Sequence, residues 1–233
     1  MKFPFYSSLL MAAVVLTGCS HKPAPPTEKE ISSTEVHTGN GSVVTIKGYE
    51  QLRTDTDAPT DVSLRYITRG DTGKMVALKT LGFVAQALLG SAQATGFDKY
   101  QLVGTPITTM PNPTLEYLSK GIENSLRTQQ AETKSIAPLQ PVEIRPYSWM
   151  LVYENLSGGD SYELYYQASI MHTANVKLED DSRLALISCH PTAVKAPLAQ
   201  WQANGYEKVT EVTREYMDSC LKDFEAHKTQ FLL

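Results

Sequence analysis

YELYYQASIMHTANVKL, residues 162–178, shows the clearest alternation of apolar and polar side chains in this 233-residue chain. A period of two is typical of a half-buried β-strand, in which every second side chain points to the same face. At about 3.3 Å per residue the run is too long for one ordinary strand, so we expect a bend or bulge within it. One face would be formed by Tyr162, Leu164, Tyr166, Ala168, Ile170, His172, Ala174, Val176 and Leu178.

The segments on both sides of this strand predict an antiparallel hairpin and a further strand. SWMLVYE (148–154) precedes it as a strand candidate, and NLSGGDS (155–161) supplies a turn with two glycines. A second turn, EDDSR (179–183), leads to LALISC (184–189), which has the composition of a last strand. Three further strands are expected earlier in the chain, at SVVTIKG (42–48), VSLRYITR (62–69) and KYQLVGT (99–105).

Helical patterns occur on both sides of the hairpin. Residues 113–130 begin after Asn112, a good capping residue, and repeat leucine or isoleucine at helical spacing. Residues 207–227 place one apolar side along the helix, and residues 75–94 have helical composition throughout. Together with the strands, these patterns predict an α+β fold, in which a largely antiparallel sheet carries about three packed helices in a single domain over residues 42–233.

The stretch MVALKTLGFVAQALLGSAQA (75–94) is open to three interpretations. Its apolar residues extend around most of the helix, which favours a buried core helix, whereas Gly82, Ala85 and Gly90 would let another backbone approach, as in an oligomer contact. A membrane-inserting segment is the third interpretation. Polar residues interrupt the stretch and about 18 residues are too few to span a bilayer comfortably. We therefore favour the core helix.

The N-terminus has the features of a secretory leader. Lys2 supplies positive charge and LLMAAVVL (9–16) forms an apolar core of eight residues, far short of a membrane-spanning helix. The following Leu16-Thr17-Gly18-Cys19 resembles the lipobox of bacterial lipoprotein precursors. The resemblance implies that residues 1–18 form a signal peptide and that Cys19 becomes the lipidated first residue, carrying acyl chains such as palmitate. In this family an aspartate after the cysteine signals inner-membrane retention, so Ser20 implies outer-membrane sorting.

Residues after the cysteine have little to bury. SHKPAPPTEKEISSTEVHTGNG (20–41) is rich in proline, serine, threonine and charge, so residues 19–41 are predicted to form a lipidated, disordered tether. More than one acyl chain gives stable anchoring. The expected location is therefore the outer membrane, with the protein anchored by lipid and facing the periplasm.

Composition and motifs exclude several functions and point to no reaction. The formal net charge of −4 and the scattered basic residues argue against nucleic-acid binding. No nucleophile elbow, phosphate-binding loop, zinc-protease motif or paired Cys-x-x-Cys occurs, so we expect no catalytic residue, metal or cofactor. His172 lies on the apolar strand face, where a hydrogen-bonded core histidine is favoured over a pocket residue. Asp180 and Asp181 are explained as a solvated turn.

Two cysteines remain for the folded domain, and an oxidising compartment would pair them. Cys189 and His190 are neighbours on a strand, so their side chains diverge and do not suit a nucleophile and its base. Cys220 falls on the apolar side of the last predicted helix. We therefore predict a Cys189–Cys220 disulfide closing a loop of about 30 residues.

The hairpin also concentrates aromatic side chains. Such rings can stack on sugars, including peptidoglycan, or anchor a protein partner, but cross-strand aromatic pairs in a sheet core give the same pattern. Core packing is favoured, except that Tyr165 should lie on the opposite side of the sheet from Tyr162 and Tyr166. The candidate binding surface consists of Tyr147, Trp149, Tyr153, Tyr162, Tyr165 and Tyr166.

Three functional hypotheses follow from the sequence. The first is a non-enzymatic outer-membrane lipoprotein that binds or scaffolds a cell-envelope component, a protein or peptidoglycan. The second is a periplasmic hydrolase with an unrecognised site, and the third is an oligomeric or pore-associated lipoprotein that uses residues 75–94. The order of strands and helices is loosely similar to periplasmic lipoproteins that assist secretion or activate cell-wall synthases, which favours the first hypothesis. Neither the partner nor the oligomeric state follows from the sequence.

Overall fold

The computed structural model describes residues 27–39, 41–52, 61–71, 73, 98–128, 139–175, 177–178 and 182–233. Eight strands form one sheet, and their bounds are β1 Glu28–His37, β2 Val43–Gln51, β3 Ser63–Ile67, β4 Thr105–Pro111, β5 Val142–Tyr153, β6 Ser161–Thr173, β7 Leu184–Cys189 and β8 Val194–Pro197. The α-helices are α2 Thr114–Thr128, α3 Leu198–Gln202 and α4 Glu207–His227. Short 3₁₀ turns are η1 Lys99–Gln101, η2 Ala203–Gly205 and η3 Lys228–Leu232.

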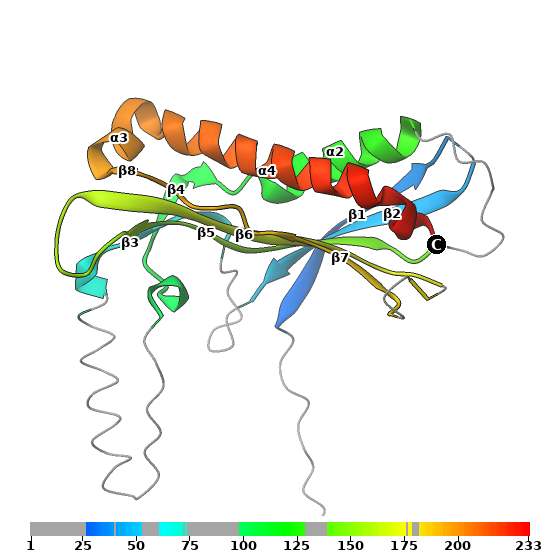
Figure 1. Cartoon of the computed structure of the whole chain (residues 1–233), viewed down its shortest axis with the longest axis horizontal. Coiled ribbons are helices and arrows are strands. Elements are labelled where there is room, and N and C mark those ends of the chain that lie inside the picture. The colour runs from blue at the N-terminus through cyan, green and yellow to red at the C-terminus, as the bar shows by residue number, and fades with distance from the viewer. Residues whose placement is uncertain are drawn as a thin grey trace, which may run out of the picture.

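The long β5–β6 hairpin forms the centre of a long, twisted sheet (Figure 1). The strand order is β1-β2-β5-β3-β4, and β6 pairs with β5 on one side and with β7 and β8 on the other. The fold is therefore α+β, as predicted, but the sheet is mixed, because β2 and β3 both pair with β5 in parallel. A parallel pairing needs a crossover connection, and α2 lies between β4 and β5 in the chain.

Strand β5 changes its neighbour halfway along its length. Residues Val142–Ile144 pair with β2, and Met150–Val152 pair with β3, so the intervening residues have no partner on that side among the described strands. Pro146 lies in this interval, where the register to β6 also shifts. Because proline cannot donate to a ladder, a bulge at an unpaired stretch is where a strand tolerates it. Asp61 substitutes for the missing strand by accepting the Trp149 backbone N–H (3.2 Å).

The predicted alternation along residues 162–178 is confirmed for the strand itself. Its even-numbered residues from Tyr162 to His172 are buried, and they face the helices. The strand ends at Thr173, however, before the predicted Leu178. The expected irregularity lies in the partner strand, between Pro146 and Ser148 of β5: each residue of β6 from Tyr162 to His172 has a partner in β5, whereas Tyr147 of β5 has none in β6.

The prediction of a disordered tether over residues 19–41 is wrong for β1. This strand pairs antiparallel with β2 from Glu28↔Gln51 to His37↔Val43. Only Val36 of the strand is buried, so the polar composition is that of an edge strand with both faces largely in water. Backbone hydrogen bonds to β2 order the segment, and the amino-acid composition does not reveal them.

Other elements also depart from the sequence prediction. KYQLVGT was expected to form a strand, but its first residues form η1, where the Asp98 carboxylate caps the Tyr100 backbone N–H (2.9 Å). Strands β4 and β8 and the short α3 were not predicted. Helices α2 and α4 agree closely with the predicted residues 113–130 and 207–227. The expected helix over residues 75–94 lies outside the described residues, as do residues 1–18 and Cys19.

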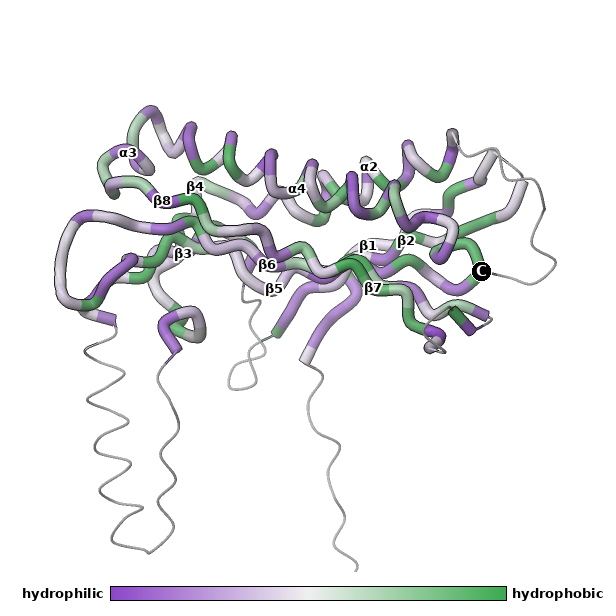
Figure 2. The backbone as a smooth tube through the Cα atoms, viewed as in Figure 1, coloured by the Kyte–Doolittle hydropathy of each residue, from purple (hydrophilic) through white to green (hydrophobic). Residues whose placement is uncertain are grey.

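Helices α2 and α4 cover one face of the sheet, and the main core lies between these helices and the sheet (Figures 1 and 2). The helices approach closely where they meet: a Cβ on Gly121 of α2 would lie 2.4 Å from Leu221 of α4. Similarly, Gly48 of β2 leaves room for Leu115 of α2. Among the described residues, no helix is long and apolar enough to cross a membrane.

The predicted disulfide between Cys189 and Cys220 is present. Their α-carbons are 5.4 Å apart across a sequence separation of 31 residues. Both side chains are buried, Cys189 at the end of β7 and Cys220 on the sheet-facing side of α4. The bond therefore fastens the last helix to the outer part of the sheet.

Candidate functional site

The six predicted aromatic residues do not form one surface, because they lie on two faces of the sheet. Trp149, Tyr153, Tyr162 and Tyr166 are at most 5% exposed and belong to the core under the helices. For these four residues the predicted binding surface is wrong. Only Tyr147 and Tyr165 remain half-buried, and both lie on the other face.

Two of these four residues, Trp149 and Tyr162, are held by hydrogen bonds of their side chains. The Trp149 indole Nε1–H donates to the Thr213 hydroxyl of α4 (2.9 Å), which joins the central strand to the helix layer. The Tyr162 ring lies 5.4 Å from that of Tyr66, whose hydroxyl donates to the Tyr162 hydroxyl (3.1 Å). A buried polar group that is satisfied in this way stabilises the fold. These rings are therefore structural.

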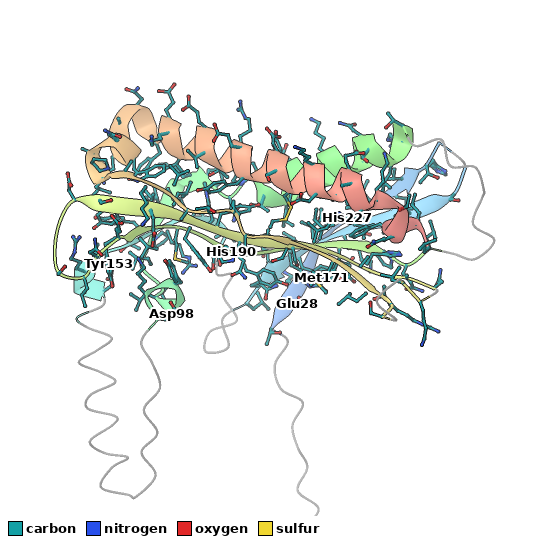
Figure 3. All side chains as sticks on the ribbon, in the orientation of Figure 1. Glu28, Asp98, Tyr153, Met171, His190 and His227 are labelled. Carbon is teal, nitrogen blue, oxygen red and sulfur yellow. A yellow bond between two sulfur atoms is a disulfide. The ribbon has the colours of Figure 1, made fainter. Side chains whose placement is uncertain are left out.

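The opposite face carries polar and aromatic side chains, and α2, α3 and α4 all lie on the other side of the sheet (Figure 1). We call this surface the open face. Figure 3 shows Glu28 and Met171 on this side and His227 on the helix side. Strand pairing and side-chain contacts place on it Lys47, Tyr49, Glu143, Arg145, Tyr147, Gln167, Ser169, Met171, Leu184, Leu186 and His190.

Arg145 organises the centre of the open face. Its guanidinium forms two hydrogen bonds to the Glu28 carboxylate (2.8 and 3.0 Å) and one to Glu143 Oε2 (2.6 Å). It also lies 4.4 Å from the centroid of the Tyr49 ring, a cation–π distance. The hydrogen bonds from Arg145 hold the pKa of the Glu28 carboxyl below its usual value. Two strands that are not neighbours, β1 and β5, are thereby joined across β2.

Tyr147 and Met171 continue this surface along the sheet. The Tyr147 hydroxyl lies 3.1 Å from the Ser169 hydroxyl, and Arg145 Nη1 lies 3.6 Å from the Met171 sulfur. Met171 is paired across the ladder with Leu186, which is 54% exposed. The open face therefore changes from charged at β5 to apolar at its β7 margin.

A second aromatic group lies at the hairpin end of the same face. Tyr100 of η1 stacks on Tyr165 at 4.2 Å, and the His190 ring meets the edge of Tyr165 at 5.2 Å. Beneath them the buried Glu163 accepts hydrogen bonds from Lys99 Nζ (2.5 Å) and the Tyr100 hydroxyl (2.7 Å). Burial and the bond to Glu163 raise the pKa of Tyr100, so its hydroxyl stays a donor at neutral pH.

Tyr165 accordingly lies opposite Tyr162 and Tyr166, as the strand alternation predicted. Tyr100, Tyr49 and Arg145 were missed as members of this surface. Tyr49 follows the predicted strand 42–48 directly, and Arg145 precedes the predicted strand at 148–154. Had the predicted strands been extended to the observed bounds of β2 and β5, both residues would have been placed on the sheet. The face on which Arg145 lies could not have been predicted, because it depends on the bulge at Pro146.

His172, Cys189 and His190 occupy the places that strand geometry predicted. Cys189 is buried and His190 is exposed, so the two side chains diverge. His172 is 1% exposed, with its Nδ1 3.3 Å from the Pro141 carbonyl oxygen. Burial lowers the pKa of His172 below its usual value, which keeps the ring neutral in the core.

Two grooves occur on the helix-bearing side of the described structure. The larger, about 440 Å³, lies between α2 and Leu221 of α4 and includes Tyr117 and Gly121 in its lining. The smaller, about 230 Å³, lies at the start of α2 beside Asp61, whose carboxylate is paired with Arg65 (2.8 Å). In the residues that the structure describes, no group of three or more histidine, cysteine, aspartate or glutamate side chains is arranged to hold a metal.

The fold thus defines an α+β protein with helices on one face of a mixed sheet and a polar, aromatic surface on the other. No protein-family model, curated protein or solved structure matches the chain. The N-terminal sequence and the open face are therefore the two features that bear on function.

Proposed function

We propose that this protein is a non-enzymatic lipoprotein of the outer membrane that binds or scaffolds a cell-envelope component through the open face. The sequence Leu16-Thr17-Gly18-Cys19 after an eight-residue apolar run supports a lipid anchor at Cys19. Ser20 after that cysteine supports outer-membrane sorting, with the domain facing the periplasm.

The observation that carries the binding role is the composition of the open face. A sheet face in water normally carries scattered polar side chains, but this one holds an ion-pair network around Arg145 and the half-buried rings of Tyr49, Tyr147 and Tyr165. Rigid aromatic side chains and arginine are enriched where proteins bind partners, because they offer large contact area with little loss of conformational freedom.

The contacts within the open face also favour binding because they preorganise it. Arg145 is held by three hydrogen bonds, Tyr165 is stacked on Tyr100, and the Tyr147 hydroxyl lies within hydrogen-bond distance of Ser169. A surface whose side chains are already fixed loses less conformational entropy on association. Tyrosine rings and hydroxyls suit a glycan as well as a protein, so both classes of envelope partner remain outcomes of the experiment below.

The anchor is tested by metabolic labelling with a fatty-acid probe. The wild-type protein should be labelled and the Cys19→Ala variant should not, and membrane fractionation should place the wild type with outer-membrane markers. Equal labelling of both proteins would exclude acylation at Cys19. Residence with inner-membrane markers would exclude the sorting.

The binding role is tested by crosslinking in living cells from a photoreactive residue at His190, which is exposed beside Tyr165. A matched probe at Glu215, exposed on α4, serves as the control. We expect His190 to give a defined product, either a protein or a fragment released by peptidoglycan hydrolases, that Glu215 does not give. Products from Glu215 alone, or from neither position, would contradict binding at the open face.

A further inference from the structure

The sheet has an unpaired edge at β7. This strand pairs only with β6, and no other described strand continues the sheet beyond it. An edge strand presents unpaired backbone N–H and C=O groups, which can pair with another chain. Natural proteins usually protect such edges with charged residues, proline or very short strands.

The other described edge strands carry that protection, and β7 does not. β1 contains Glu28, Lys29, Glu30 and Glu35, β4 contains Pro106 and Pro111, and β8 contains Lys195 and Pro197. The six residues of β7, LALISC, include neither a charge nor a proline. Of the four described edge strands, three are therefore protected and β7 is able to pair.

The exposed side of β7 carries two leucines where a solitary edge strand usually carries polar side chains. Leu184 and Leu186 are 43% and 54% exposed on the open face, followed by the exposed Ser188, and Leu186 is paired with the half-buried Met171. Alternate residues Ala185, Ile187 and Cys189 are buried on the side that faces α4. The disulfide from Cys189 to Cys220 holds the strand against that helix, so the edge is rigid before any partner arrives.

We propose that β7 is the pairing strand for a second copy of this chain, in an antiparallel arrangement that joins the two sheets into one. A strand without charged residues can meet an identical strand with no like charges opposed. The arrangement is isologous and closes on itself, so it gives a dimer rather than a fibre. This proposal does not depend on the lipid anchor or on the partner of the open face.

One register brings the exposed leucines of the two copies together. If Ala185 lies opposite Ala185 of the second copy, Leu184 of each chain faces Leu186 of the other. The four leucines then form an apolar patch on the open face, with each Leu186 beside Met171 of its own chain. Only residues 184–186 of each strand lie opposite β7 of the second copy in this register, and so small an interface gives a weak, concentration-dependent dimer.

The test is sedimentation of the detergent-solubilised full-length protein over a range of concentrations. The wild type should change from monomer to dimer as concentration rises. Leu186→Lys places two ammonium groups in this apolar patch and should weaken the dimer about tenfold or more. The matched control is Leu156→Lys, since Leu156 is 57% exposed in the β5–β6 turn and far in sequence from β7. This control should leave the dimer unchanged.

Leu184→Lys provides a second variant in the same strand, and the thermal midpoint of each variant shows that it is folded. A monomeric wild type at every concentration would overturn the proposal. It would also be overturned if folded Leu186→Lys and Leu184→Lys dimerised as the wild type does, or if Leu156→Lys weakened the dimer equally.

Discussion

Removal of the Cys189–Cys220 disulfide is the perturbation whose effect the structure defines best. Both sulfurs are buried, and the bond joins β7 to α4 across 31 residues of sequence. Replacing both cysteines by alanine keeps the side chains small and apolar, so the folded state should survive with its packing largely intact. The main effect should be on the unfolded chain, which gains freedom when the loop is opened.

The magnitude follows from the length of that loop. With 31 residues in the loop, the chain-entropy relation gives about 12 cal/mol/K, or about 3.7 kcal/mol at 25 °C. For a chain of this size, about 2–4 °C of melting temperature accompanies each kcal/mol, so the midpoint should fall by about 7–15 °C. Small cavities left by the two sulfurs would add to the loss.

Urea unfolding followed by tryptophan fluorescence is the assay, because both tryptophans, Trp149 and Trp201, are fully buried in the fold. The Cys189→Ala/Cys220→Ala variant should unfold with about 3–4 kcal/mol less free energy than the oxidised wild type. Reductant should destabilise the wild type by a similar amount and leave the double variant unchanged. A loss under about 1 kcal/mol, or an equal response of both proteins to reductant, would refute the loop-entropy argument.

Three further predictions concern single positions. Gly104→Ala should lower the free energy of unfolding in urea by about 2 kcal/mol, because Gly104 has φ +64° and the new Cβ would lie 2.6 Å from the Tyr66 carbonyl oxygen. An unchanged unfolding midpoint would contradict the positive φ. Trp149→Phe should cost about 2 kcal/mol by leaving the buried Thr213 hydroxyl without its donor, and adding Thr213→Val should recover part of that loss. The pKa of His172 is lowered in the folded state, so below about pH 6.5 the unfolded chain binds the proton more readily than the folded protein does. The free energy of unfolding should therefore fall as pH falls. The difference in this free energy between pH 7.5 and about pH 5.5 should be smaller in His172→Gln.

Local pattern was sufficient for the elements whose side chains report their surroundings directly. The alternation along β6 identified its buried face from Tyr162 to His172, and the apolar spacing of residues 207–227 identified α4 over the same residues. The Cys189–Cys220 bond followed from the number of cysteines and the faces on which they fall. In each case a periodic burial of side chains leaves a periodic sequence.

Only the tertiary structure decided which strands are neighbours and which aromatic side chains meet. β1 is polar because it is an edge strand, and its order comes from backbone pairing with β2, which leaves no signature in side-chain composition. The parallel pairing of β5 and the bulge at Pro146 determine that Tyr147 and Arg145 lie on the open face while Trp149 lies in the core. A shift of one residue reverses the face of every side chain beyond it, and the interactions that set this register act between strands far apart in the chain.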